Sequence, residues 1–105
     1  MTEKDRKIAK HLRDRLASLV QLVDLRVFGS RARGDAEDDS DLDVFVEVES
    51  LDKILKERIL EVVWEVGFEN FMVISPLIFT RDEIESSPLR SSPIVKVIFQ
   101  EGLPV

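Results

Sequence analysis

The sequence predicts an α/β (α+β) fold, in which helices and a few short strands occur along one chain. Two long stretches carry apolar residues at a spacing of three and four, which is typical of amphipathic helices. A third stretch, residues 41–48, alternates polar and apolar side chains as a strand does. The predicted order is helix, strand, strand, helix, strand, short helix and helix.

The first helix is predicted over residues 3–23. The charged residues on its other faces have mixed signs, which indicates a solvated surface. Its apolar face consists of Ile8, Leu12, Leu16, Leu19, Val20 and Val23. His11 lies on this helix, and because the chain has no Cys and no second His, we assign it no metal role. Residues 24–28 follow as a short strand that ends at a Gly-Ser turn.

The second strand is predicted over "DLDVFVEV", residues 41–48. Side chains repeat every two residues along a strand, so Asp41 and Asp43 project from the same face. The aliphatic residues that alternate with them are expected to pack into the core; they are Leu42, Val44, Val46 and Val48.

The next helix is predicted to begin after Ser50 as N-cap and to end at Gly67. Trp64 and Phe68 are expected in the core or at its edge. The apolar face predicted for this helix consists of Leu51, Ile54, Leu55, Ile59, Val62, Val63 and Val66.

The last third of the chain predicts one strand and two helices. The strand covers roughly residues 70–79, and Ser75-Pro76 makes it irregular or close to a sheet edge, because proline cannot donate to a central ladder. "TRDE", residues 80–83, fits a capping box for a short helix. Ser92-Pro93 is typical of a helix start and Gly102 of a helix end.

Length and composition narrow the class of protein. At 105 residues the chain matches one domain, so we expect a single domain over residues 1–105. With 44% hydrophobic and 34% charged residues it resembles a soluble protein, and no apolar run approaches the roughly 20 residues that span a bilayer. The absence of Cys and of a signal-peptide pattern favours a cytoplasmic location. The net charge of −6 argues against direct nucleic-acid binding.

The stretch "FGSRARGDAEDDSDLDV", residues 28–44, carries the candidate chemistry. Two carboxylates, on Asp41 and Asp43, can hold Mg²⁺ that is shared with substrate phosphates. Such metals stabilise the attacking and leaving oxygens of a nucleotidyl displacement. Gly29 permits a close backbone approach, and Ser30 offers a hydroxyl and an N–H to a phosphate. Arg31 and Arg33 are candidates to neutralise a further phosphate oxygen.

Three other patterns could account for the residues of this stretch. Gly29 and Gly34 are spaced as in a Walker A loop, but Asp35-Ala36 stand where Lys and Ser or Thr are required. A calcium loop from Asp39 would need a glycine where the chain has Val44. A plain solvated acidic loop is the remaining alternative, although so many neighbouring carboxylates are unfavourable without a cation.

Gly29-Ser30, ten further residues and then Asp41-Leu42-Asp43 resemble the signature of the DNA polymerase beta-like nucleotidyltransferase superfamily, and of its minimal nucleotidyltransferase branch. The resemblance implies a small mixed β-sheet with helices packed against it. It also implies transfer of a nucleoside monophosphate, AMP from ATP, to a hydroxyl with the help of one or two Mg²⁺ ions. Asp41 and Asp43 would be the catalytic metal ligands, and Gly29, Ser30 and Arg33 would bind the nucleotide.

The sequence departs from this family pattern at one place. Catalytic members carry a third carboxylate on a later strand, whereas "FMVISPLIFT", residues 71–80, contains none. Ser75 stands near the expected position, and a neutral hydroxyl neither offsets metal charge nor accepts a proton well. Glu47, Glu69 or a partner protein are the candidates to compensate.

Minimal nucleotidyltransferases of this kind are often paired with a small helical HEPN-type protein, as antitoxin and toxin. The resemblance therefore implies two functions: adenylylation of a hydroxyl on such a partner, or neutralisation of the partner by contact alone. A free enzyme that modifies a small molecule is a third hypothesis, for which the sequence shows no acceptor pocket.

Overall fold

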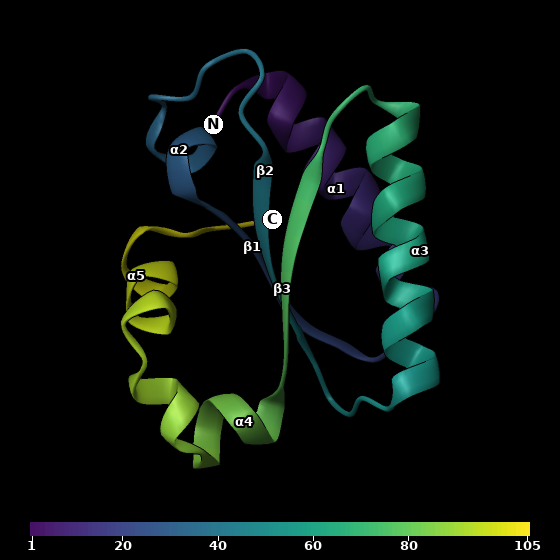
Figure 1. Cartoon of the computed structure of the whole chain (residues 1–105), viewed down its shortest axis with the longest axis vertical. Coiled ribbons are helices and arrows are strands. Elements are labelled where there is room, and N and C mark those ends of the chain that lie inside the picture. Colours follow the sequence, from purple (N-terminus) through teal and green to yellow (C-terminus); the bar gives the residue numbers. More distant parts are fainter.

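The computed structural model describes all 105 residues as a four-stranded mixed sheet between two layers of helices (Figure 1). The elements are α1 (Glu3–Ala17), β1 (Leu22–Phe28), α2 (Gly29–Arg33), β2 (Leu42–Val48), α3 (Lys53–Glu69), β3 (Ile74–Thr80), α4 (Arg81–Ser86), the 3₁₀ helix η1 (Pro88–Ser91), α5 (Pro93–Glu101) and β4 (Leu103–Pro104). The strand order is β3-β2-β1-β4. β1 runs antiparallel to β2 and β4, and β2 runs parallel to β3. No helix has the length and apolar character needed to cross a membrane.

Helix α1 begins at the capping box formed by Thr2 and Asp5, and it ends at Ala17. The prediction that it continues to Val23 is wrong. From Leu22 onward the backbone joins the ladder with β2, in which Leu22 pairs with Val48. The helical spacing continued past the true end because Leu19 and Val20, beyond the helix, still pack against the core.

The sheet is covered on both faces, so β2 is buried from both sides. Its aliphatic residues pack into the larger core cluster, as predicted, and there they face α1 and α3. On the opposite face Phe45 packs with Phe28 and with Ile98 of α5. Figure 1 shows α1 and α3 on one side of the sheet and α5 on the other. The sequence did not indicate that Phe45 and Glu47 would also be buried, because that depends on α5.

Helix α3 differs from its prediction at both ends. Asp52 caps its N-terminus instead of Ser50, by accepting from the Leu55 N–H at 2.7 Å. The helix continues past Gly67 to Glu69. Gly67 serves close packing instead, because a Cβ there would lie 2.5 Å from the Met72 carbonyl oxygen.

Trp64 and Phe68 of α3 are 67% and 69% exposed, so the prediction that they belong to the core or its edge is wrong. Ile54 is 70% exposed as well. The buried stripe of Ile59, Val63 and Val66 faces the sheet, and Leu55 and Val62 pack against the same core while remaining partly exposed. Because β3 is the last strand on this side, nothing covers the flank of α3 that lies beyond it.

The C-terminal third agrees more closely with its prediction. Strand β3 is an edge strand that contains Pro76, as expected, although it begins at Ile74 because residues 70–73 form the turn after α3. Thr80 and Glu83 form the predicted capping box of α4. Helix α5 begins at Pro93 and ends before Gly102. The short strand β4, which pairs with β1, was not predicted.

Candidate functional site

The candidate site lies at the end of the sheet where β1 stops and β2 begins. Helix α2 starts at Gly29, directly after β1, and Phe28 is the antiparallel partner of Asp43. The loop between α2 and β2 returns the chain so that Asp41 immediately precedes β2. Two segments that are ten residues apart in sequence therefore meet at one sheet end.

Gly29 and Asp43 are in direct contact in this arrangement. Gly29 has a φ of 73°, in the left-handed region that glycine adopts without strain. A Cβ at this position would overlap the Oδ2 atom of Asp43. Glycine is therefore required here both for the turn and for the space that the carboxylate occupies.

The Asp43 carboxylate is held in an environment that disfavours its charge. Partial burial raises its pKa above the ordinary value, and the negative charge of Asp41 raises it further. The Arg33 guanidinium opposes both effects. Arg33 itself is 46% exposed and lies 3.3 Å from Asp35 and 3.6 Å from Glu101. A cation placed between Asp41 and Asp43 would relieve their repulsion.

Ser75 is the register partner of Asp43 across the parallel pair β2 and β3. It therefore lies beside Asp43, near the position where the family resemblance implies a third carboxylate. Glu47 lies four residues along β2 from Asp43, a separation of about 13 Å. Glu69 ends α3 on the opposite face of the sheet, 4.0 Å from His11. Neither glutamate reaches the Asp41 and Asp43 pair, and no group of three His, Cys, Asp or Glu side chains could hold a metal ion.

The comparison with known families decides the identity of this arrangement. The family model described as a nucleotidyltransferase domain matches residues 8–103, which covers both helical layers, the sheet and the site. The chain belongs to the nucleotidyltransferase domain family. No curated protein matches the chain.

Solved structures of nucleotidyltransferases share the fold of this domain. One described as a minimal nucleotidyltransferase is 24% identical, with a TM-score of 0.66, and the alignment covers 95% of this chain and 91% of the other. A nucleotidyltransferase structure from Sulfolobus solfataricus is 21% identical, with a TM-score of 0.55 and coverages of 97% and 82%. A toxin–antitoxin structure with AMP-PNP is 23% identical, with a TM-score of 0.59 and coverages of 95% and 70%.

In this nucleotidyltransferase domain the Arg31 side chain is bound within the protein, where it holds the loop between α2 and β2 in place. Its side chain is only 9% exposed and its Nη1 donates to the Asp5 carboxylate at 3.0 Å. It also donates to the carbonyl oxygens of Ser40 at 2.9 Å and Asp38 at 3.1 Å. Arg31 is thus not available as a phosphate contact, contrary to its inclusion among the candidates. No sequence pattern indicates this pairing, because Asp5 resembles any other charged residue at the start of a helix.

The carboxylates of Asp41 and Asp43 in this nucleotidyltransferase domain are suitable ligands for one Mg²⁺ ion that both would contact. Mg²⁺ is commonly bound by one or two carboxylates together with substrate phosphates and water. The site is open to solvent: Asp41 is exposed, Asp43 and Ser30 are half-buried, and none of the three cavities is lined by any of them. An acceptor would therefore approach Asp41 and Asp43 from the surface.

Proposed function

We propose that this chain, as a single cytoplasmic domain, is a Mg²⁺-dependent nucleotidyltransferase that transfers AMP from ATP to a hydroxyl on a partner protein. The observation that carries the proposal is the close approach of Gly29 to the Asp43 carboxylate, at the sheet end where Ser30 and Asp41 are their neighbours in the chain. Family membership supports the reaction class. The raised pKa of Asp43 supports a site that becomes favourable when a cation is bound.

Each residue has a defined role in this proposal. Asp41 and Asp43 would hold Mg²⁺, which neutralises charge on the phosphate oxygens as the acceptor hydroxyl attacks the α-phosphorus and pyrophosphate leaves. Ser30 would donate to the triphosphate with its hydroxyl or its backbone N–H. Gly29 leaves room for that approach, and Arg33 would neutralise a phosphate oxygen from the rim of the site.

The choice of nucleotide and partner rests on the relatives. A structural relative is a toxin–antitoxin structure with AMP-PNP, an ATP analogue, which supports an adenine nucleotide for this chain as well. It also supports a protein partner, for which we propose a small helical protein of the HEPN type. The open site agrees with an acceptor as large as a protein, because no enclosed cavity restricts access to Asp43.

A second function is favoured by one specific observation. Ser75 occupies the position beside Asp43 and supplies no charge. A domain with two carboxylates could bind the nucleotide or the partner without transferring AMP, and neutralise the partner by contact. Under this alternative Asp41→Asn and Asp43→Asn would leave partner inhibition intact.

The first test is a calorimetric titration of the protein with ATP, in the presence and absence of Mg²⁺. We expect Mg²⁺-dependent binding that Asp43→Asn abolishes. Asp39→Asn, which removes an exposed carboxylate of the same loop, is the matched control and should bind as the wild type does. Equal binding by the wild type and Asp43→Asn would refute the assignment of Asp43. Binding without AMP transfer to the co-purified partner would favour the second function.

A further inference from the structure

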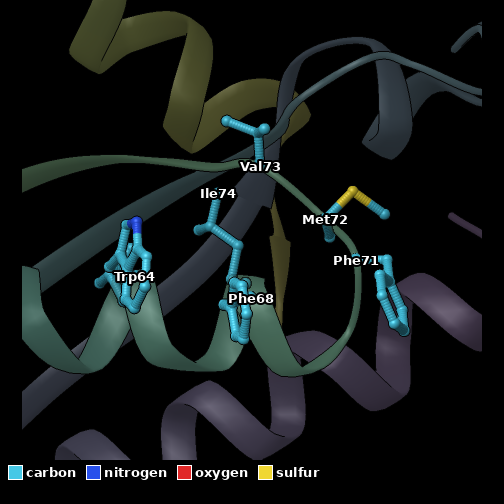
Figure 2. A pocket seen from close by; sticks show the side chains of 8 residues that line it. Trp64, Phe68, Phe71, Met72, Val73 and Ile74 are labelled. Atoms are coloured by element: carbon cyan, nitrogen blue, oxygen red, sulfur yellow. The ribbon is translucent and has the colours of Figure 1, made fainter.

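The flank of α3 beside the edge strand β3 forms an exposed apolar patch, which we define as Leu60, Trp64, Phe68, Phe71 and Val73. The exposed fractions of these side chains are 42%, 67%, 69%, 96% and 66%. Trp64 and Phe68 stack with their ring centroids 5.2 Å apart. Four residues of the patch line a cavity of about 390 Å³: Trp64, Phe68, Phe71 and Val73. The other residues that line it are Val63, Gly67, Met72 and Ile74. Figure 2 shows Trp64 and Phe68 projecting from α3, and Phe71 and Met72 beyond its end.

Phe71 is costly for the isolated chain in two ways. It follows the C-cap Asn70 and has a φ of 54°, the left-handed conformation at which helices usually place glycine. Its N–H donates to the Phe68 carbonyl and the Met72 N–H to the Gly67 carbonyl, which closes α3 with a Schellman turn. The ring is nevertheless almost fully exposed. In the isolated chain the Phe71 ring therefore gains no burial that could offset the strain of its positive φ.

The charges of α3 are arranged against its own dipole. The N-terminal half carries Lys53, Lys56 and Arg58 with one acidic residue, whereas the C-terminal half carries Glu61, Glu65 and Glu69 with no basic residue. Acidic groups near the N-terminus and basic groups near the C-terminus would stabilise a helix, so this order is unfavourable for α3 alone. Glu65 is paired with Arg15 of α1 and Glu69 lies 4.0 Å from His11, so α1 offsets part of this cost.

We propose that the occupant of this patch is a second copy of the chain, in a two-fold symmetric dimer with the two α3 helices antiparallel. In a two-fold symmetric dimer the same surface of both copies forms the interface, so that surface must be complementary to itself. This patch has both a protruding side chain, the Phe71 ring, and a cavity beside Trp64 and Phe68 that could accept one.

The size of the patch agrees with a dimer. Its three aromatic rings leave roughly 450 Å² exposed, given areas of about 150–250 Å² for a whole aromatic side chain. With Leu60 and Val73, the two copies would bury about 1,200 Å² in total, the lower end of the range for specific interfaces. Pro76 interrupts the outer edge of β3, which disfavours a partner that adds a strand there.

Sedimentation velocity over a wide range of concentration tests this dimer. We expect the wild type to associate to twice the mass of the chain. Trp64→Glu should raise the dissociation constant at least about thirtyfold. Phe71→Gly should do the same while keeping or raising the melting temperature, because glycine accepts the positive φ. Leu89→Glu, a charge at an exposed leucine of η1 outside the patch, is the control and should dimerise normally.

Two results would overturn the proposal. One is a wild type that stays monomeric at every concentration, which would mean that the patch serves a different partner or none. The other is a dimer that persists with wild-type affinity in both Trp64→Glu and Phe71→Gly, which would place the interface elsewhere. The thermal stability of Phe71→Gly separates loss of association from loss of folding.

Discussion

Asp43 on β2 and Ser75 on β3 are direct partners in the parallel register of the sheet. Their side chains therefore leave the same face of adjacent strands. This places a neutral hydroxyl beside the carboxylate of Asp43, whose pKa is raised by partial burial. Two carboxylates, those of Asp41 and Asp43, are thus available to a metal. The register shows that an acidic residue in place of Ser75 would add a third.

The substitution Ser75→Asp should tighten Mg²⁺ binding about tenfold, because a third carboxylate would join Asp41 and Asp43. Calorimetric titration with Mg²⁺ in the presence of ATP measures the change. Ser75→Asn has a similar size without the charge and should leave the affinity near that of the wild type. Equal affinities for the Asp and Asn variants would show that position 75 does not reach the metal.

The substitution Gly29→Ala should abolish ATP binding and lower the free energy of unfolding by about 1–3 kcal/mol. The added Cβ would overlap the Asp43 carboxylate and would also strain the positive φ. Gly34→Ala is the matched control, since Gly34 has a φ of 84° but no atom within 4 Å of the added Cβ. Urea unfolding and ATP titration of both variants separate overlap from backbone strain. Similar ATP binding by the two would contradict the role assigned to Gly29.

Replacement of Asp43 by Asn should stabilise the metal-free protein at neutral pH. Because the pKa of Asp43 is raised in the folded state, the folded protein binds more protons than the unfolded one as pH rises from the ordinary value of 3.8 to the raised value. Stability conferred by the wild-type residue therefore falls through that window. The melting temperature of Asp43→Asn should exceed that of the wild type at pH 7, and the difference should shrink below pH 3.8.

Addition of Mg²⁺ and ATP should reverse this order, because only the wild type can bind them through Asp43. Asp39→Asn, in the exposed part of the loop, should show neither effect. A wild type that is already more stable than Asp43→Asn without ligand would show that the Asp43 charge is compensated inside the protein.

Replacement of Arg31 by Met should lower the free energy of unfolding by about 3–5 kcal/mol, because it leaves the Asp5 carboxylate buried without its partner. It would also remove the donors to the Ser40 and Asp38 carbonyls that hold the loop before β2. Arg33→Met, at an arginine that is 46% exposed, should cost less than about 1 kcal/mol. Urea unfolding measures both, and equal losses would contradict the structural role of Arg31.

Most of the local structure, and the candidate residues of the site, could be predicted from short stretches of the sequence. The spacing of Asp41 and Asp43 on a strand, the Gly29-Ser30 turn and the caps at Thr80 and Ser92 depend on residues close together in the chain. Local periodicity and capping chemistry can be read directly from such residues. The resemblance built on Gly29-Ser30 and Asp41-Leu42-Asp43 led to the family that the comparison confirmed.

The partner that each side chain meets depends on how distant segments pack together, which local patterns do not reveal. The pairing of Arg31 with Asp5 joins residues 26 positions apart, and the register of Asp43 with Ser75 spans 32. The exposure of Trp64 and Phe68 depends on β3 being the last strand of the sheet, which no pattern within α3 reveals. Helical periodicity shows that a face is apolar, but only the arrangement of neighbouring elements determines whether anything covers it.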